Sequence, residues 1–118
     1  MWRISAKILL AALSLYLLGA CSPVSVEYTD NKDVYVDTKI YKQEGAFLIV
    51  YATLRNNDSD DVNNSVYRVE WYNDDGLLLE KTSWRPAQVK GGAAVHVRER
   101  STIPGATKAN IVLSNDAR

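Results

Sequence analysis

The residue types that supply a nucleophile or a base are scarce in this chain. The sequence has one cysteine, Cys21, and one histidine, His96. A catalytic Cys or Ser needs a base beside it and an acid that orients the base. His96 alternates with Val95 and Val97, which is typical of a half-exposed strand residue, and Cys21 directly follows an apolar N-terminal segment. We therefore expect no catalytic residues and no enzymatic activity.

The carboxylates are equally weak candidates for a site. Asp58, Asp60 and Asp61 lie close together, but a calcium loop also needs a Gly and a late Glu in register, which are missing here. Glu70 and Glu80 would face each other across a hairpin, but two acids without an apolar pocket do not make a glycosidase. No His or Cys residues have the spacing of a zinc site. The sequence predicts a solvated turn at the aspartates, and no metal or other cofactor.

The N-terminal segment explains the single cysteine. Residues 1–20 contain two basic residues and no acid, and their apolar run from Ile8 to Leu18 ends in two small residues, Gly19 and Ala20. This order of basic, apolar and small residues is the layout of a secretory signal peptide. The apolar run is shorter than the roughly 20 residues that a transmembrane helix needs.

The four residues Leu18–Cys21 resemble the lipobox of bacterial lipoproteins. The resemblance implies that the Cys21 sulfur receives a diacylglycerol, that residues 1–20 are removed, and that the new amino group is acylated. Ser22 rather than Asp after the cysteine implies sorting to the outer membrane, facing the periplasm. We therefore expect residues 21–26 to be a lipidated tether, with the membrane as a partner through the lipid.

Charge and composition limit the remaining classes of protein. The 118 residues include 14 Lys and Arg and 14 Asp and Glu, so the chain is formally neutral. Nucleic-acid binders carry a basic excess, so no nucleic-acid partner is expected. The length and the 47% hydrophobic content fit one small globular domain, which we place at residues 27–118. One cysteine also excludes an intramolecular disulfide.

Hydrophobic alternation with a period near two indicates strands throughout this domain, and no segment has a helical period. The segment 46–55 is apolar on both faces, so it should be a central strand. Tyr67, Val69 and Trp71 form a stripe that can supply the core of a sandwich. The fold class is therefore an antiparallel β-sandwich of about seven strands, similar to immunoglobulin and fibronectin type III domains. The expected strands are 24–29, 34–43, 46–55, 65–72, 77–81, 95–98 and 108–114.

The segment Val66–Leu77, VYRVEWYNDDGL, is similar to the signature Y-R-x-x-W-Y-D-x-x-G-L of the YcfL-like family. That family comprises small bacterial lipoproteins with a domain of unknown function and an immunoglobulin-like sandwich. The resemblance covers about Leu48 to Leu113. The chain departs from the pattern at Asn73, where the family has Asp, and in the strongly charged stretch 98–102. The resemblance implies a fold and a cellular address, but no reaction.

The remaining candidates are aromatic and basic residues that follow the predicted hairpin. Trp84 and Arg85 are adjacent, and Tyr72 lies in the motif before them. Exposed aromatic and arginine side chains are preferred anchors of protein interfaces, although Trp84 would also serve to cap the core. We expect a non-enzymatic, lipid-anchored periplasmic module that contacts another envelope protein. The alternative is a binding lipoprotein for a cell-wall glycan or small molecule, with Trp84 and Tyr72 as the stacking surface.

Overall fold

The computed structural model describes residues 22–29, 33–57 and 62–114, with only the backbone of residues 62 and 63. The predicted signal peptide, Cys21 and the three aspartates at 58–61 lie outside these ranges. The described part contains eight strands: β1 (Val24–Thr29), β2 (Val34–Glu44), β3 (Phe47–Asn56), β4 (Val62–Tyr72), β5 (Leu78–Lys81), β6 (Arg85–Lys90), β7 (Ala94–Arg100) and β8 (Lys108–Ser114). None of the described segments is a helix of the length and apolarity that a membrane span requires.

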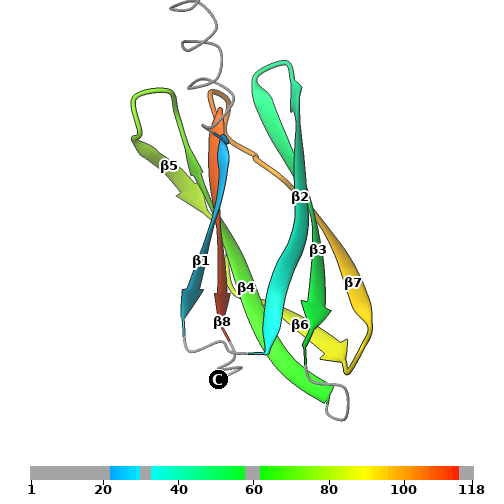
Figure 1. The fold of residues 1–118 in the computed structure, drawn as a ribbon. Coiled ribbons are helices and arrows are strands. Elements are labelled where there is room, and N and C mark those ends of the chain that lie inside the picture. The colour runs from blue at the N-terminus through cyan, green and yellow to red at the C-terminus, as the bar shows by residue number, and fades with distance from the viewer. Residues whose placement is uncertain (1–21, 30–32, 58–61, 115–118) are drawn as a thin grey trace, which may run out of the picture.

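The strands form two sheets that face each other (Figure 1). The five-stranded sheet has the order β1-β8-β4-β5, and β6 pairs with β4 beyond the end of β5. The three-stranded sheet has the order β2-β3-β7. The predicted β-sandwich is therefore confirmed, with one parallel pair, between β1 and β8, among otherwise antiparallel neighbours.

The core lies between the sheets and follows the predicted alternation. β3 is central in its sheet, as expected, and its inward residues are buried: Leu48, Val50, Ala52 and Leu54. The facing stripe comes from β4, where Trp71 is 0% exposed and is the largest fully buried side chain. Asn56 joins the layers, because its Nδ2 donates to the carbonyl of Val89 in β6 at 2.9 Å.

Strand β6 is the element that the sequence pattern did not predict. Its buried residues Ala87 and Val89 alternate with exposed Gln88 and Lys90, which is strand periodicity over a very short segment. Pro86 argues against a strand because proline donates no ladder hydrogen bond. The proline is tolerated here because β6 pairs with β4 alone and is therefore an edge strand.

Strand β1, Val24–Thr29, confirms the expected strand 24–29 and overlaps the segment 21–26 that was also expected to be a tether. Val24 is 2% exposed and pairs with Ala109 of β8. The folded domain therefore includes residues 24–26, and the boundary expected at residue 27 is too late.

The β4–β5 hairpin shows why Asn73 can replace the aspartate of the family pattern. The Asn73 Oδ1 accepts hydrogen bonds from the backbone amides of Asp75 and Leu77, each at 3.0 Å. A carboxylate oxygen would accept the same bonds. Gly76 follows with a φ of 80°, the left-handed conformation that favours glycine in such turns.

Candidate interaction surface

Trp84 lies on the outer face of the five-stranded sheet and does not cap the core. Its side chain is 44% exposed. The Arg68 guanidinium carbon lies 4.6 Å from the centre of the Trp84 ring, a cation–π contact. Among the described residues the buried Arg68 Nε has no hydrogen-bond acceptor, and the cation–π contact with the Trp84 ring stabilises the guanidinium instead.

Tyr72 is on the same outer face and belongs to a polar cluster, the Glu70 network. Its hydroxyl donates to Glu70 Oε1 at 3.3 Å, and Asn110 Nδ2 donates to the same oxygen at 3.0 Å. Arg68 completes the network, with its Nη2 3.5 Å from the other carboxylate oxygen. Desolvation, followed by the nearby Glu70 charge, raises the pKa of Tyr72. The signature residues Arg68 and Tyr72 are therefore both bonded to Glu70.

Arg85 does not join Trp84 and Tyr72, so the predicted grouping of three residues is wrong. In β6 it shares the inward side with Ala87 and Val89, at the open edge between the sheets. Its Nε lies 3.0 Å from Glu99 in β7, and the Tyr67 hydroxyl donates to the same carboxylate at 2.7 Å. Burial, then this hydrogen bond, raises the pKa of Tyr67 strongly. Arg85 therefore helps to close the edge of the sandwich.

Glu70 and Glu80 also lie apart. Glu80 pairs with Trp71, the inward neighbour of Glu70, so the two acids point to opposite sides of the sheet. The Glu80 carboxylate accepts from the amide and hydroxyl of Thr102, each at 2.6 Å, and from the amide of Ile103 at 3.1 Å. Partial burial alone would raise the pKa of Glu80, but these hydrogen bonds lower it. We refer to this set of contacts as the Glu80 clamp.

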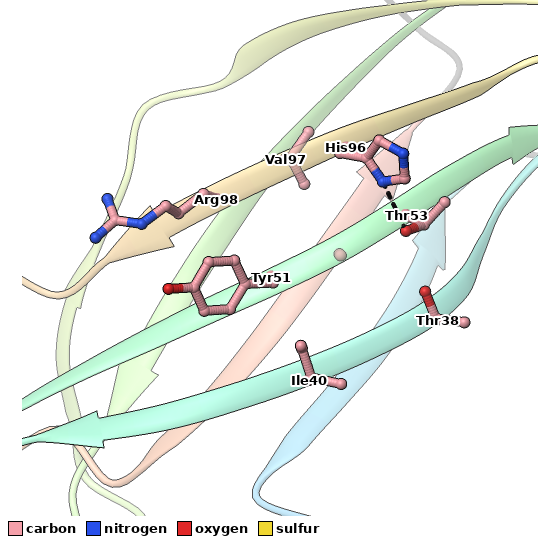
Figure 2. A pocket seen from close by; sticks show the side chains of 8 residues that line it. Thr38, Ile40, Tyr51, Thr53, His96, Val97 and Arg98 are labelled. Atoms are coloured by element: carbon pink, nitrogen blue, oxygen red, sulfur yellow. Dashed lines mark hydrogen bonds between the residues drawn. The ribbon is translucent and has the colours of Figure 1, made fainter.

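The outer face of the three-stranded sheet carries a hollow that the sequence reasoning missed. Its volume is about 290 Å³, and it opens over the middle of the sheet (Figure 2). All three strands contribute outward side chains to it: Thr38 and Ile40 from β2, Tyr51 and Thr53 from β3, and His96 and Arg98 from β7. Ile40 is 63% exposed, so an aliphatic side chain borders the hollow.

Two arginines of β7 extend this surface along the sheet. Arg98 lies over the Tyr51 ring at 5.9 Å, and Arg100 lies over the Phe47 ring at 4.3 Å. Within the described ranges neither guanidinium forms an ion pair. We call these four residues, together with those lining the hollow, the arginine–aromatic face. The signals for it were the charged stretch after residue 97 and the second apolar side of β3, which only the pairing of β3 with β7 brings together.

His96 lies exposed on this face, as predicted for a strand residue. Its Nδ1 forms a 3.0 Å hydrogen bond with the Thr53 hydroxyl. No hydrogen bond or ion pair joins it to a carboxylate in the part of the chain that the structure describes. The described residues also contain no group of three or more His, Cys, Asp or Glu side chains placed to hold a metal ion. The face offers aromatic rings, cations and hydroxyls, which suit recognition.

The structure is an all-β sandwich domain. On the outer face of its three-stranded sheet, Arg98 and Arg100 form no ion pair within the described ranges. A family model described as "Protein of unknown function (DUF1425)" matches residues 24–115, and the chain belongs to this family.

Two solved structures are similar to the chain. Campylobacter jejuni cj0090 aligns with a TM-score of 0.64 and 16% identity, over 81% of this chain and 100% of that one. A DUF1425 family member from Shewanella sp. pv-4 aligns with a TM-score of 0.62 and 22% identity, over 72% of this chain and 83% of that one. At these identities the likeness establishes the fold. No curated protein sequence matches the chain significantly.

Proposed function

We propose that this protein is a lipid-anchored domain of the bacterial envelope that binds another envelope protein and catalyses no reaction. The arginine–aromatic face is the observation that carries the proposal. Tyr and Arg are enriched among the residues that dominate binding energy at interfaces. Arg98 and Arg100 lie on aromatic rings and keep their charge available, because no ion pair engages them in the described ranges.

The proposed address rests on the N-terminal sequence. Residues 1–20 would be the signal peptide and Cys21 the lipid acceptor, and Ser22 favours the outer membrane, facing the periplasm. Within the DUF1425 family the chain would then be a YcfL-like lipoprotein. Two or three acyl chains give a stable anchor, whereas one chain holds a protein only marginally.

The anchor is tested by Cys21→Ser. This variant should lose the acyl mass and either leave the membrane fraction or persist as an uncut precursor. Continued membrane attachment with unchanged lipid labelling would contradict the assignment.

The partner is tested by crosslinking in cells followed by mass spectrometry. The wild-type protein should yield a specific envelope protein, and Arg98→Ala should lose it. Arg55→Ala is a matched control, because Arg55 is on the same sheet but its Nε already lies 2.8 Å from Asp37. Recovery of the same bulk lipoproteins from all three proteins would exclude a specific partner at this face.

A binding lipoprotein for a cell-wall glycan or small molecule is the second candidate. The observation in its favour is the hollow, where Thr53, His96 and Arg98 supply polar groups beside the Tyr51 ring. Its volume of about 290 Å³ is at the lower end of ligand pockets, which span roughly 300–1,000 Å³. Trp84 and Tyr72 are less suited to stacking, since both are engaged on the other sheet. Calorimetric titration with soluble cell-wall fragments tests this candidate, and Tyr51→Ala should abolish any heat that the wild type gives.

A further inference from the structure

One end of the sandwich gathers the start of β1 and three connections between strands (Figure 1). β1 begins there at Val24. The amide of Gly105, in the β7–β8 loop, donates to Ala46 of the β2–β3 turn at 2.8 Å. The amide of Thr107 donates to Tyr72, where the β4–β5 hairpin starts, at 2.9 Å. We call this the β1-start end. The other end holds the end of β1 and the β6–β7 turn.

Exposed aliphatic side chains concentrate at the β1-start end. Leu77 is 64% exposed, Leu78 is 45% exposed and Ile103 is 41% exposed. These three residues form what we call the apolar rim. Ile40 is the other large aliphatic residue among the exposed hydrophobic residues of the described chain, and it lies on the arginine–aromatic face. Exposed apolar groups that gather in one place mark sites of interaction with a protein or a membrane.

The apolar rim is held in place by hydrogen bonds. The Glu80 clamp ties Thr102 and Ile103 to β5, the strand that begins with Leu78. Asp74, at the tip of the adjoining hairpin, accepts from the Thr107 hydroxyl at 2.7 Å, which joins the hairpin to the start of β8. Leu77 and Leu78 on the β4–β5 hairpin and Ile103 in the β7–β8 connection therefore lie on two segments that hydrogen bonds tie together.

We propose that the β1-start end is a membrane-contact surface, with the apolar rim in the interfacial region of the lipid bilayer. The proposal rests on the acylation of Cys21 advanced above. Cys21 is three residues from Val24, so the chain spans at most about 10 Å between the lipidated residue and the sheet. The anchor therefore keeps this end at the bilayer, where aliphatic side chains are favoured. The strands then run away from the membrane, and the arginine–aromatic face points sideways into the periplasm.

Lipid quenching of site-specific labels tests this orientation. Acylation of Cys21 leaves no free thiol in the mature protein, so Leu77→Cys, Ile103→Cys and Lys90→Cys each introduce a single labelling site. Lys90 is exposed at the end of β6, at the opposite end of the sandwich. Each full-chain variant is purified, labelled with a polarity-sensitive fluorophore and placed in phospholipid vesicles with and without brominated lipid.

The labels at positions 77 and 103 should lose fluorescence in brominated lipid and shift their emission to the blue, and the label at position 90 should do neither. An acylated protein whose three labels behave alike would overturn the membrane-contact surface and leave the anchor standing. A mass spectrum without acyl groups would overturn the anchor and the membrane-contact surface together.

Discussion

The outer faces of the two sheets use similar residue types in different ways. On the five-stranded sheet Arg68 and Tyr72 are both bonded to Glu70, and Trp84 covers the arginine. On the three-stranded sheet Arg98 lies over a ring without an ion pair in the described ranges, beside a hollow of about 290 Å³. Composition alone therefore does not identify a binding face. A face whose polar side chains bond to one another stabilises the fold, whereas a face whose arginines form no ion pair can bind a partner.

The largest expected effect is on binding by the three-stranded sheet. Replacing Arg98 and Arg100 together by Ala should reduce capture of the crosslinked partner by about 30-fold, the equivalent of about 2 kcal/mol for central anchor residues. The free energy of unfolding should fall by only about 1 kcal/mol, because exposed cation–π contacts are weak. Capture is measured at matched expression, and stability by urea denaturation. Full capture by the double variant would remove the difference between the faces.

The Glu70 network should show the opposite behaviour. Glu70→Ala leaves Asn110, Tyr72 and Arg68 without their shared acceptor, which should lower the free energy of unfolding by about 2 kcal/mol. Glu70→Gln retains an acceptor and should lose less. Partner capture by the folded fraction should not change. An unaltered urea midpoint for Glu70→Ala would show that this network is not a source of stability.

Trp84→Ala should lower the free energy of unfolding by less than Glu70→Ala does. Trp84→Ala removes a half-exposed ring and one cation–π contact, so the free energy of unfolding should fall by about 0.5–1 kcal/mol. Capture of the partner should stay at the wild-type level. Loss of capture with normal folding would instead identify the five-stranded sheet as the binding face, as the sequence alone suggested.

The smallest expected effect is the loss of stability at alkaline pH that comes from Tyr72 in the Glu70 network. The pKa of Tyr72 is raised in the folded state, so its contribution to stability is complete below the unfolded pKa of about 10 and declines as the pH rises through the folded pKa. Raising the pH from about 8 to about 10.5 should therefore destabilise the wild type more than Tyr72→Phe. Both proteins retain Tyr67, whose pKa is also raised, so the difference reports Tyr72. Equal losses in the free energy of unfolding, measured by urea denaturation, would count against a raised pKa of Tyr72 in the folded state.

The sequence predicted those elements whose alternation is long and regular. β3 and β4 were found because inward apolar residues repeat over their length, and this repeat also identified Trp71 as a core residue. β6 was missed because only Ala87 and Val89 carry its pattern and Pro86 contradicts it. Without β6 the inward side of Arg85 was hidden, so Arg85 was grouped with Trp84.

The arginine–aromatic face could not be predicted from local sequence patterns. It depends on the register that sets Tyr51 opposite Arg98 and opposite Ile40. β2 and β3 are consecutive strands, but β7, which carries Arg98, lies far from both in the sequence. The same holds for the contact of Trp84 with Arg68, because the connection between β5 and β6 has no periodicity that indicates its path. Local sequence patterns predict individual strands, whereas the residues of a surface are brought together by the pairing of strands.

The most direct measurement compares the two faces in living cells with a photoreactive amino acid. It is placed at Ile40, which is exposed beside the hollow, and separately at Gln88, which is exposed on β6 of the five-stranded sheet. Binding by the three-stranded sheet predicts a discrete adduct with an envelope protein from position 40 and none from position 88. An adduct from position 88 alone, or equal adducts from both, would contradict the assignment of binding to the three-stranded sheet.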